Sequence, residues 1–365
     1  MLYMTLSACL LGAGLALAAG AQAANTAIPA WAVKVEGRAL AKDQAWLATW
    51  PGVSWQARFD GSAVGVRLDD SRNYYLLQVD GQTVREIEPA SGERVVWARN
   101  LPPGPHLAAL IKRTESPQYA GRFAGFALEN GRVLQAPPVR QRKIEVLGDS
   151  WTAAYGNRSV TLNCSEDDIT RTTDASQSYA ALLGRALDAD VRVVAHSGLG
   201  VVRNWNGSLP ALNFASYYPR VLQDRPLAAP GNQALDDGAW QPQVVVIGLG
   251  INDFSTPVNP GEPRSQEQLA RDYVAGYHRL IASVRERYGD VAMVLTGTYL
   301  WPDDRLRPLA AQVANEQRAQ GRSVAYVEWR DIELTGCNWH PSLADHRKMA
   351  EQVLAGIRSL GSVWY

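Results

Sequence analysis

The sequence predicts two folded units, an all-β sandwich followed by an α/β domain built on a parallel sheet. In residues 33–134, short strand-like segments alternate with turn residues, and no helical period runs through them. From residue 143 onward, apolar strand-like segments alternate with helical ones, which is typical of a doubly wound sheet covered on both faces. Pro137-Pro138 lies between the two patterns and is expected to be a linker.

The first unit is predicted from its strands and turns. Three short segments have the composition of strands: 54–59, 63–68 and 74–79. The pairs Asp60-Gly61 and Asp80-Gly81 directly follow the first and third segments and are expected to be turns. Because closely spaced short strands favour a sandwich, we expect a β-sandwich or jelly roll over residues 30–136.

The second unit is expected over residues 141–365. Its predicted strands are 144–147, 191–195, 244–248, 291–296 and 324–327, and its predicted helices are 178–187, 266–288, 309–319 and 343–357. One face of the longest helix carries Leu269, Tyr273, Tyr277, Leu280 and Val284, so this face should pack on the sheet. We therefore expect a three-layer α/β/α domain around a parallel five-stranded sheet.

The composition bounds the possible partners. The chain has 365 residues, of which 46% are hydrophobic, and it can bury sizeable cores. Lys plus Arg and Asp plus Glu both total 36, and no basic run stands out, so neither nucleic acid nor an anionic membrane surface is an expected partner. The 12 tryptophans fit stacking on sugar rings and ordinary core packing equally well.

The N-terminus has the pattern of a secretory signal peptide. Residues 6–19 are apolar, and Ala21-Gln22-Ala23 is a small-x-small cleavage site, although residues 1–5 lack the usual positive charge. We predict a signal peptide at residues 1–23 and a periplasmic or extracellular mature protein. A membrane anchor is not expected, because the apolar stretch is short and ends in a cleavage site.

Two cysteines remain once the predicted signal peptide is removed, Cys164 and Cys337. An oxidising compartment favours one disulfide between them, and two separate buried thiols are the alternative. Cys337 lies three residues before His340, and Cys164 lies fourteen residues after Ser150. The bridge would therefore join the loop after the serine to the loop that carries the histidine.

Three short blocks carry residues suited to ester hydrolysis: Gly148-Asp149-Ser150, Gly250-Ile251-Asn252-Asp253 and His340-Pro341-Ser342. The first two follow predicted strands, where α/β enzymes keep their active sites. Ser150 is the candidate nucleophile, and His340 is the candidate base because a serine hydroxyl is a poor nucleophile at neutral pH. Considered by itself, His340 would more often be a capping or core histidine.

Hydrolysis of an ester also requires hydrogen-bond donors where the oxyanion develops. The Asn252 side chain and the backbone N–H groups of Ser150 and Gly198 are the candidates. Individually each has an ordinary explanation, since Asn252 fits an Asx turn and Gly198 fits a plain turn. The order of all four residues along the chain favours the chemical interpretation.

In that order and spacing, Ser150, Gly198, Asn252 and His340 resemble the four blocks of the SGNH (GDSL-type) hydrolases, over roughly residues 143–360. The Gly-x-Ser-x-Gly motif of the α/β-hydrolase lipases is absent. The resemblance implies the nucleophile, base and oxyanion donors named above, in an SGNH hydrolase domain.

A narrower resemblance is to carbohydrate esterase family 2, in which a β-sandwich precedes the SGNH domain. Four blocks carry it: Trp50-Pro51-Gly52, Arg58-Phe59-Asp60-Gly61, Tyr155-Gly156-Asn157 and Cys337-Asn338-Trp339-His340-Pro341-Ser342. It implies a secreted serine esterase that removes O-acetyl groups from xylan, glucomannan or their oligosaccharides. We expect a monomer that needs no metal and no cofactor.

One position departs from the family pattern. SGNH hydrolases usually have an aspartate three residues before the histidine, and here that residue is Cys337. We expect a Ser150–His340 dyad in which a backbone carbonyl accepts the other ring N–H of the histidine. Asp253 and Asp345 are the alternative acids for a complete triad.

The substrate is less constrained by the sequence than the chemistry is. Trp205, Trp301 and Trp339 lie in loops at strand ends or beside the base and are candidates for stacking on sugar rings. A second possibility is a periplasmic esterase that acts on O-acetyl groups of peptidoglycan, on lipids or on small esters. A third is a carbohydrate-binding protein with an inert hydrolase domain.

Overall fold

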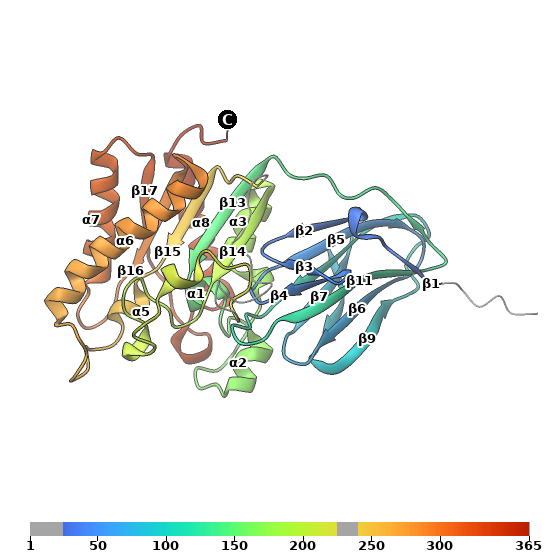
Figure 1. Cartoon of the computed structure of the whole chain (residues 1–365), viewed down its shortest axis with the longest axis horizontal. Coiled ribbons are helices and arrows are strands. Elements are labelled where there is room, and N and C mark those ends of the chain that lie inside the picture. Colours follow the sequence, from blue (N-terminus) through green and yellow to red (C-terminus); the bar gives the residue numbers. More distant parts are fainter. Residues whose placement is uncertain (1–24, 225–239, 365) are drawn as a thin grey trace, which may run out of the picture.

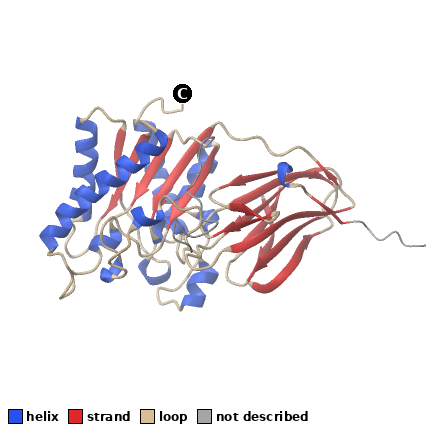
Figure 2. Cartoon of the chain, viewed as in Figure 1, coloured by secondary structure: helices blue, strands red, loops and turns tan. Residues whose placement is uncertain are grey.

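The computed structural model describes residues 25–224 and 240–364. The predicted signal peptide, residues 1–23, lies outside the described residues. Figure 1 shows two units side by side in an elongated molecule, with the C-terminal end of the chain on the α/β unit. Figure 2 shows one unit built almost entirely of strands and another in which helices flank the strands, as the sequence predicts.

Two antiparallel sheets form the β-sandwich. The first has the order β3 (Leu40–Lys42), β4 (Ala45–Ala48), β11 (Gly121–Glu129), β6 (Val64–Asp70) and β9 (Ala90–Ala98), and β1 (Asn25–Ala27) also pairs with β11. The second has the order β12 (Arg132–Val133), β5 (Ser54–Asp60), β10 (Pro105–Lys112), β7 (Tyr75–Val79) and β8 (Gln82–Ile87), and β2 (Val33–Glu36) also pairs with β5. A short 3-10 helix, η1, spans Ala30–Ala32.

Strand alternation and turn chemistry explain these elements. In β5, Trp55, Ala57 and Phe59 are fully buried, while the residues between them are partly or fully exposed. Asp80 and Gly81 join β7 to β8 as a two-residue loop, with φ of 51° and 79°. Positive φ at both positions is what a hairpin turn of this length requires, so the predicted Asp-Gly turn is confirmed.

The second unit contains one parallel sheet in the order β14 (Ala189–Ala195), β13 (Arg142–Gly148), β15 (Val244–Gly248), β16 (Ala292–Thr298) and β17 (Val324–Trp329). Its helices are α1 (Ser150–Ala153), α2 (Glu166–Thr172), α3 (Tyr179–Leu187), α4 (Phe214–Tyr217), α5 (Ile251–Phe254), α6 (Gln266–Tyr288), α7 (Leu306–Ala319) and α8 (Leu343–Ser359). The described part of this unit also contains three 3-10 helices: η2 (Ala175–Gln177), η3 (Trp205–Gly207) and η4 (Cys337–Trp339).

Helices cover both faces of this sheet. Val245 and Ile247 of β15 share a core with the apolar stripe of α6, which is buried as predicted. Val244 and Val246, which alternate with them, share a core with residues of α3 and α8. The three-layer arrangement expected from the sequence is therefore confirmed. None of the described helices is long and apolar enough to cross a membrane.

Helices α7 and α2 are among those that differ from the sequence-based expectation. Helix α7 begins at Leu306, three residues earlier than predicted, because Pro308 lies in its first turn, where the missing N–H costs no helical hydrogen bond. Helix α2 was not predicted, since it buries no residue and so has no apolar period. A capping box between Ser165 and Asp168 fixes its start.

Ion pairs whose side chains are closed to solvent join the two units. Arg38 of the sandwich pairs with Glu145 of β13 at 2.9 Å, and both side chains are fully buried. Lys34 on β2 pairs with Asp190 on the edge strand β14 at 2.6 Å. Because breaking a buried pair leaves an uncompensated charge, these contacts hold the sandwich against the sheet.

Candidate active site

The four residues singled out from the sequence lie at the carboxyl edge of the parallel sheet. Ser150 follows β13, Gly198 follows β14, and Asn252 is the second residue of α5, after β15. These three strands are neighbours, so their carboxyl ends meet at one place. His340 reaches the same place from the other end of the unit, just before α8, whose N-cap is Ser342.

Ser150 is held at the start of α1. The Asp149 side chain caps this helix and accepts the N–H of Trp151 at 3.1 Å. Ser150 is 6% exposed, so its hydroxyl is largely sheltered from water. Within residues 25–224 and 240–364, the backbone N–H of Ser150 has no hydrogen-bond acceptor. That N–H therefore remains available to a ligand.

The His340 ring contacts the serine through one nitrogen and two carbonyls through the other. Its Nε2 lies 2.9 Å from Ser150 Oγ, and its Nδ1 lies 3.0 Å from the Cys337 carbonyl and 3.1 Å from that of Asn338. Carbonyl oxygens only accept, so Nδ1 carries the hydrogen and Nε2 is free to accept the hydroxyl proton. This is the geometry expected of a dyad supported by a backbone carbonyl.

Neither alternative acid contacts the histidine. Asp253 is fully buried and accepts three backbone N–H groups at 2.8–2.9 Å, those of Val201, Val202 and Arg203. Asp345 is also fully buried and accepts the N–H groups of Glu333, Leu334 and Ser342. Both carboxylates thus fix backbone segments of the site, and no carboxylate in the described part of the chain contacts the His340 ring.

Tyr155 and Gly156 pack against the segment that carries the histidine. The rings of Tyr155 and His340 have centroids 4.3 Å apart, and the Tyr155 hydroxyl accepts a long hydrogen bond from Asn338 Nδ2 at 3.4 Å. At Gly156, φ is 56°, and a Cβ would lie 2.3 Å from the Cβ of Cys337. Only glycine permits this close approach.

The candidate oxyanion donors differ in how they are engaged. Asn252 Nδ2 donates to the Leu199 carbonyl at 2.9 Å and makes a longer contact of 3.3 Å to Asp149 Oδ2. Gly198 has φ of 83°, and among the described residues its N–H has no acceptor. Asn252 thus holds the loop next to Gly198, while the Gly198 and Ser150 N–H groups are unengaged.

The predicted disulfide is present. Cys164 and Cys337 are joined across 173 residues of sequence. The bridge ties the segment before α2 to η4, whose first residue supplies a carbonyl to His340 Nδ1. It therefore links the loop after the serine to the loop of the histidine, as the spacing of the two cysteines indicates.

Comparison with known proteins identifies the family to which this chain belongs. Residues 35–138 match the family model for the carbohydrate esterase 2 N-terminal domain. Residues 146–354, more than half of the chain, match the model for the GDSL-like lipase/acylhydrolase family. The chain belongs to carbohydrate esterase family 2. It is accordingly a carboxylic ester hydrolase.

The similarity to known proteins extends over nearly the whole chain of the esterase. An acetylxylan esterase/glucomannan deacetylase of Cellvibrio japonicus is 31% identical over 96% of this chain and 97% of its own length. A family two carbohydrate esterase from Clostridium thermocellum, solved in complex with cellohexaose, is 30% identical, with a TM-score of 0.79 over 91% of this chain and all of that one. A second, from Cellvibrio japonicus, is 25% identical, with a TM-score of 0.78 over 94% of this chain and 99% of its own.

The three tryptophans proposed for sugar contact are all exposed. Trp205 is 55% exposed in η3, and its N–H donates to the Gly198 carbonyl. Trp339 is 61% exposed and immediately precedes His340, while Trp301 is 82% exposed in the segment between β16 and α7. Trp205 is thus hydrogen-bonded to Gly198, and Trp339 is next to His340 in the sequence.

One residue near the site comes from the other unit of the esterase. Glu115, in the segment after β10 of the sandwich, accepts the N–H of Ser197 at 3.0 Å. Ser197 directly precedes Gly198. No pattern in the sequence marks Glu115, because its partner lies 82 residues away in a different folded unit.

The pH dependence of kcat/KM should report the His340 imidazole. Desolvation lowers the pKa of His340 below its ordinary 6.5, although the two carbonyls act in the opposite direction. A base must be neutral, so the acid limb of kcat/KM should lie at a lower pH than that of an imidazole with the ordinary pKa of 6.5. Initial rates on p-nitrophenyl acetate measure this profile.

The titration of Asp149 must be distinguished from that of His340 in this pH profile. Burial raises the pKa of Asp149 to about 7, so its titration lies close to the same range. An Asp149→Asn variant removes this second titration while keeping an oxygen that caps α1. The same acid limb in both proteins is the expected result, and a limb that disappears in the variant would assign it to Asp149 instead.

Proposed function

We propose that this esterase is secreted and removes O-acetyl groups from xylan, glucomannan or their oligosaccharides through an acetyl-serine intermediate. The observation that carries the proposal is the 2.9 Å contact between His340 Nε2 and Ser150 Oγ at the carboxyl edge of the sheet. The similarity over 96% of the chain to an acetylxylan esterase/glucomannan deacetylase supports the substrate class. We assign the chemistry to residues 141–365, with the sandwich, residues 30–136, in support, and we expect a monomer.

In the first step, Ser150 Oγ attacks the acetyl carbon while its proton passes to His340 Nε2. The ring can accept that proton because its Nδ1–H is already held by the carbonyls of Cys337 and Asn338. The bond between the acetyl carbon and the sugar oxygen then breaks, and the sugar oxygen takes the proton from His340. The sugar leaves as a free hydroxyl, and the acetyl group stays on Ser150.

In the second step, water attacks the acetyl-serine ester. His340 takes a proton from the water as the water oxygen bonds to the acetyl carbon. The bond between the acetyl carbon and Ser150 Oγ then breaks, His340 returns the proton to Ser150 Oγ, and acetate is released. In both steps the carbonyl oxygen becomes an anion. We assign the N–H groups of Ser150 and Gly198, together with Asn252 Nδ2, as its donors.

Asn252→Ala should lower kcat about 10²- to 10³-fold on acetyl esters, because the variant loses one oxyanion donor. KM should change much less, because this donor acts mainly on the developing charge. Steady-state kinetics on p-nitrophenyl acetate measure both constants. A variant with unchanged kcat would show that the contacts of Asn252 to Leu199 and Asp149 are its whole role.

Trp339→Ala should raise KM for an acetylated xylo-oligosaccharide about tenfold, the effect of losing about 1.4 kcal/mol of stacking. Its kcat on p-nitrophenyl acetate should stay near the wild-type value. Trp31→Ala is the matched control, since Trp31 is 71% exposed on η1 of the sandwich. A lower kcat on the small ester with no change in KM for the oligosaccharide would assign Trp339 a packing role.

The first test of the proposal is acetate release from acetylated xylan, acetylated glucomannan and O-acetylated peptidoglycan, with Ser150→Ala beside the wild type. Release from a plant polymer that is lost in the variant is the expected result. Release from peptidoglycan alone would move the substrate to the bacterial wall. Polymer binding without hydrolysis of any ester would support a carbohydrate-binding protein instead.

A further inference from the structure

A short segment of the β-sandwich reaches two sides of the candidate active site. β10 ends at Lys112, and the residues after it leave the sandwich and meet the α/β unit. Within this segment, Arg113 contacts the last turn of α2 and the residue after it, and Glu115 contacts the loop after β14.

Glu115 acts on the side of the oxyanion. Its Oε2 accepts the N–H of Ser197 at 3.0 Å, one residue before the Gly198 N–H that we assign as a donor. The other end of the same loop is held from within the α/β unit, where Asp253 accepts three of its N–H groups. Glu115 is therefore the contact from the sandwich that fixes the start of the loop.

Arg113 acts on the side of the histidine. Its guanidinium donates to the Thr173 carbonyl at 3.0 Å, and Thr173 Oγ1 accepts the N–H of Gly156 at 2.9 Å. The Gly156 carbonyl accepts the N–H of Cys337 at 3.3 Å. The Cys337 carbonyl in turn lies 3.0 Å from His340 Nδ1. A continuous series of hydrogen bonds thus joins a sandwich arginine to the imidazole.

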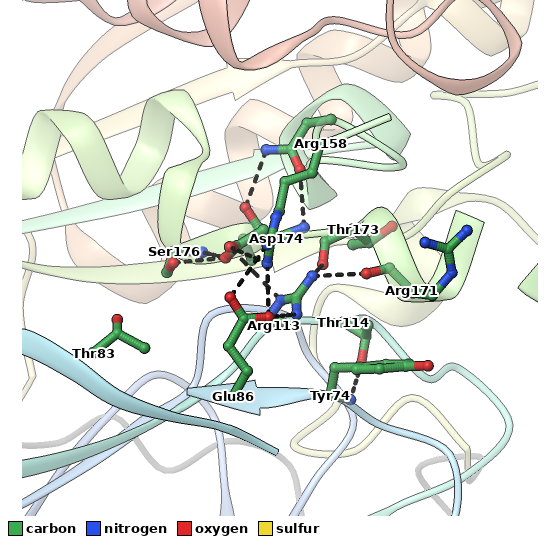
Figure 3. Close-up of polar contacts among 12 residues, drawn as sticks. Tyr74, Thr83, Glu86, Arg113, Thr114, Arg158, Arg171, Thr173, Asp174 and Ser176 are labelled. Carbon is green, nitrogen blue, oxygen red and sulfur yellow. Dashed lines mark hydrogen bonds and ion pairs between the residues drawn. The ribbon is translucent and has the colours of Figure 1, made fainter. Parts of the chain in front are cut away.

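Figure 3 shows how Arg113 is itself fixed. Glu86 of β8 contacts Arg113 and, across the interface, Arg158, with each nitrogen–oxygen distance 3.2 Å. Asp174 lies 3.7 Å from Arg113 and 3.6 Å from Arg158. Only 2% of the Arg113 side chain is exposed, so its geometry is set by these partners and not by solvent.

We propose that Arg113 and Glu115 are positioning residues of the esterase, so that the β-sandwich sets the geometry of both the histidine and the oxyanion loop. This inference rests on the proposed function, because it takes His340 as the base and Gly198 as a donor. It assigns the sandwich a part in catalysis that is separate from any binding of sugar. A displacement of about 1 Å in either group is enough to cost up to about 10²-fold in rate.

The first experiment replaces Glu115 with alanine and with glutamine. Glu115→Ala should lower kcat on p-nitrophenyl acetate about tenfold to a hundredfold and leave KM within about threefold of wild type. Glu115→Gln keeps an oxygen that can accept the Ser197 N–H and should restore kcat to within about threefold of wild type. Equal losses in both variants, or a lower Tm with unchanged kcat, would overturn the role of Glu115.

The second experiment tests the histidine side. Arg113→Met should lower kcat by a similar factor at a temperature well below its Tm. Since this buried change can prevent folding, Glu86→Gln is the milder companion and should lower kcat by about two- to fivefold. Glu93→Gln is its matched control, because Glu93 also bridges two arginines, Arg67 and Arg122, but entirely within the sandwich. Equal kcat in the Glu86 and Glu93 variants would overturn the role of Arg113.

Ser150→Ala in the same assay distinguishes a failure of the positioning role from a failure of the proposed function. If Ser150→Ala loses hydrolysis and Glu115→Ala does not, the positioning inference fails and the proposed function stands. If Ser150→Ala still hydrolyses the ester, the proposed site itself is wrong, whatever the sandwich variants do.

Discussion

Alanine in place of His340 should lower kcat for acetyl-ester hydrolysis about 10⁴-fold or more, and Ser150→Ala should lower it to a similar level. In the proposed mechanism the two side chains act as one unit, because the imidazole 2.9 Å from Ser150 Oγ accepts the proton that makes the serine a weak nucleophile. Removing the second residue after the first should therefore cost little more. The double variant is expected to match the single variants within about threefold.

Single-turnover and steady-state rates of the wild type, both single variants and the double variant test this expectation. Multiplicative losses in the double variant would show that Ser150 and His340 act independently. Asp345→Asn serves as the control for a hidden triad, because a catalytic acid replaced by its amide typically loses about 10⁴-fold in kcat. We expect only lower stability, since Asp345 accepts the N–H groups of Glu333, Leu334 and Ser342 and does not contact His340.

Local sequence pattern was sufficient for the features that arise from local physics. The Asp80-Gly81 hairpin needs two positive φ angles, and the chain has residues suited to them at those positions. Helix α6 was predicted at its observed bounds because the apolar stripe of Leu269, Tyr273, Tyr277, Leu280 and Val284 runs along one face, and this stripe is buried. Helix α2 has no such stripe, so no apolar period identified it.

In the candidate site, too, the sequence identified some features and not others. Ser150, Gly198, Asn252 and His340 were identified because their order and spacing resemble the four blocks of the SGNH hydrolases, with the first three just after predicted strands. The engagement of Asn252 with Leu199 and Asp149 was not foreseen, since those contacts depend on how three loops pack. Contacts between distant segments carry no local period and no motif.

Loss of the Cys164–Cys337 bridge should lower the free energy of unfolding by about 2–5 kcal/mol, because a bridge across 173 residues greatly restricts the unfolded chain. The catalytic geometry should suffer much less. The backbone of η4 is also held by hydrogen bonds from Cys337 N to the Gly156 carbonyl at 3.3 Å and from Asn338 N to the Leu162 carbonyl at 2.6 Å. These bonds should keep the Cys337 carbonyl beside His340 Nδ1.

Cys164→Ala and the wild type, with and without a reductant, separate the two effects. Denaturant unfolding should show the loss of stability, and kcat at 25 °C should stay within about tenfold of wild type. Adding reductant should shift the wild type toward the variant and leave the variant unchanged. A loss of kcat as large as that of His340→Ala, in a variant that is still folded, would mean that the bridge and not the backbone hydrogen bonds orients the imidazole. The disulfide at Cys337 would then orient the base from the position where SGNH hydrolases usually have an aspartate.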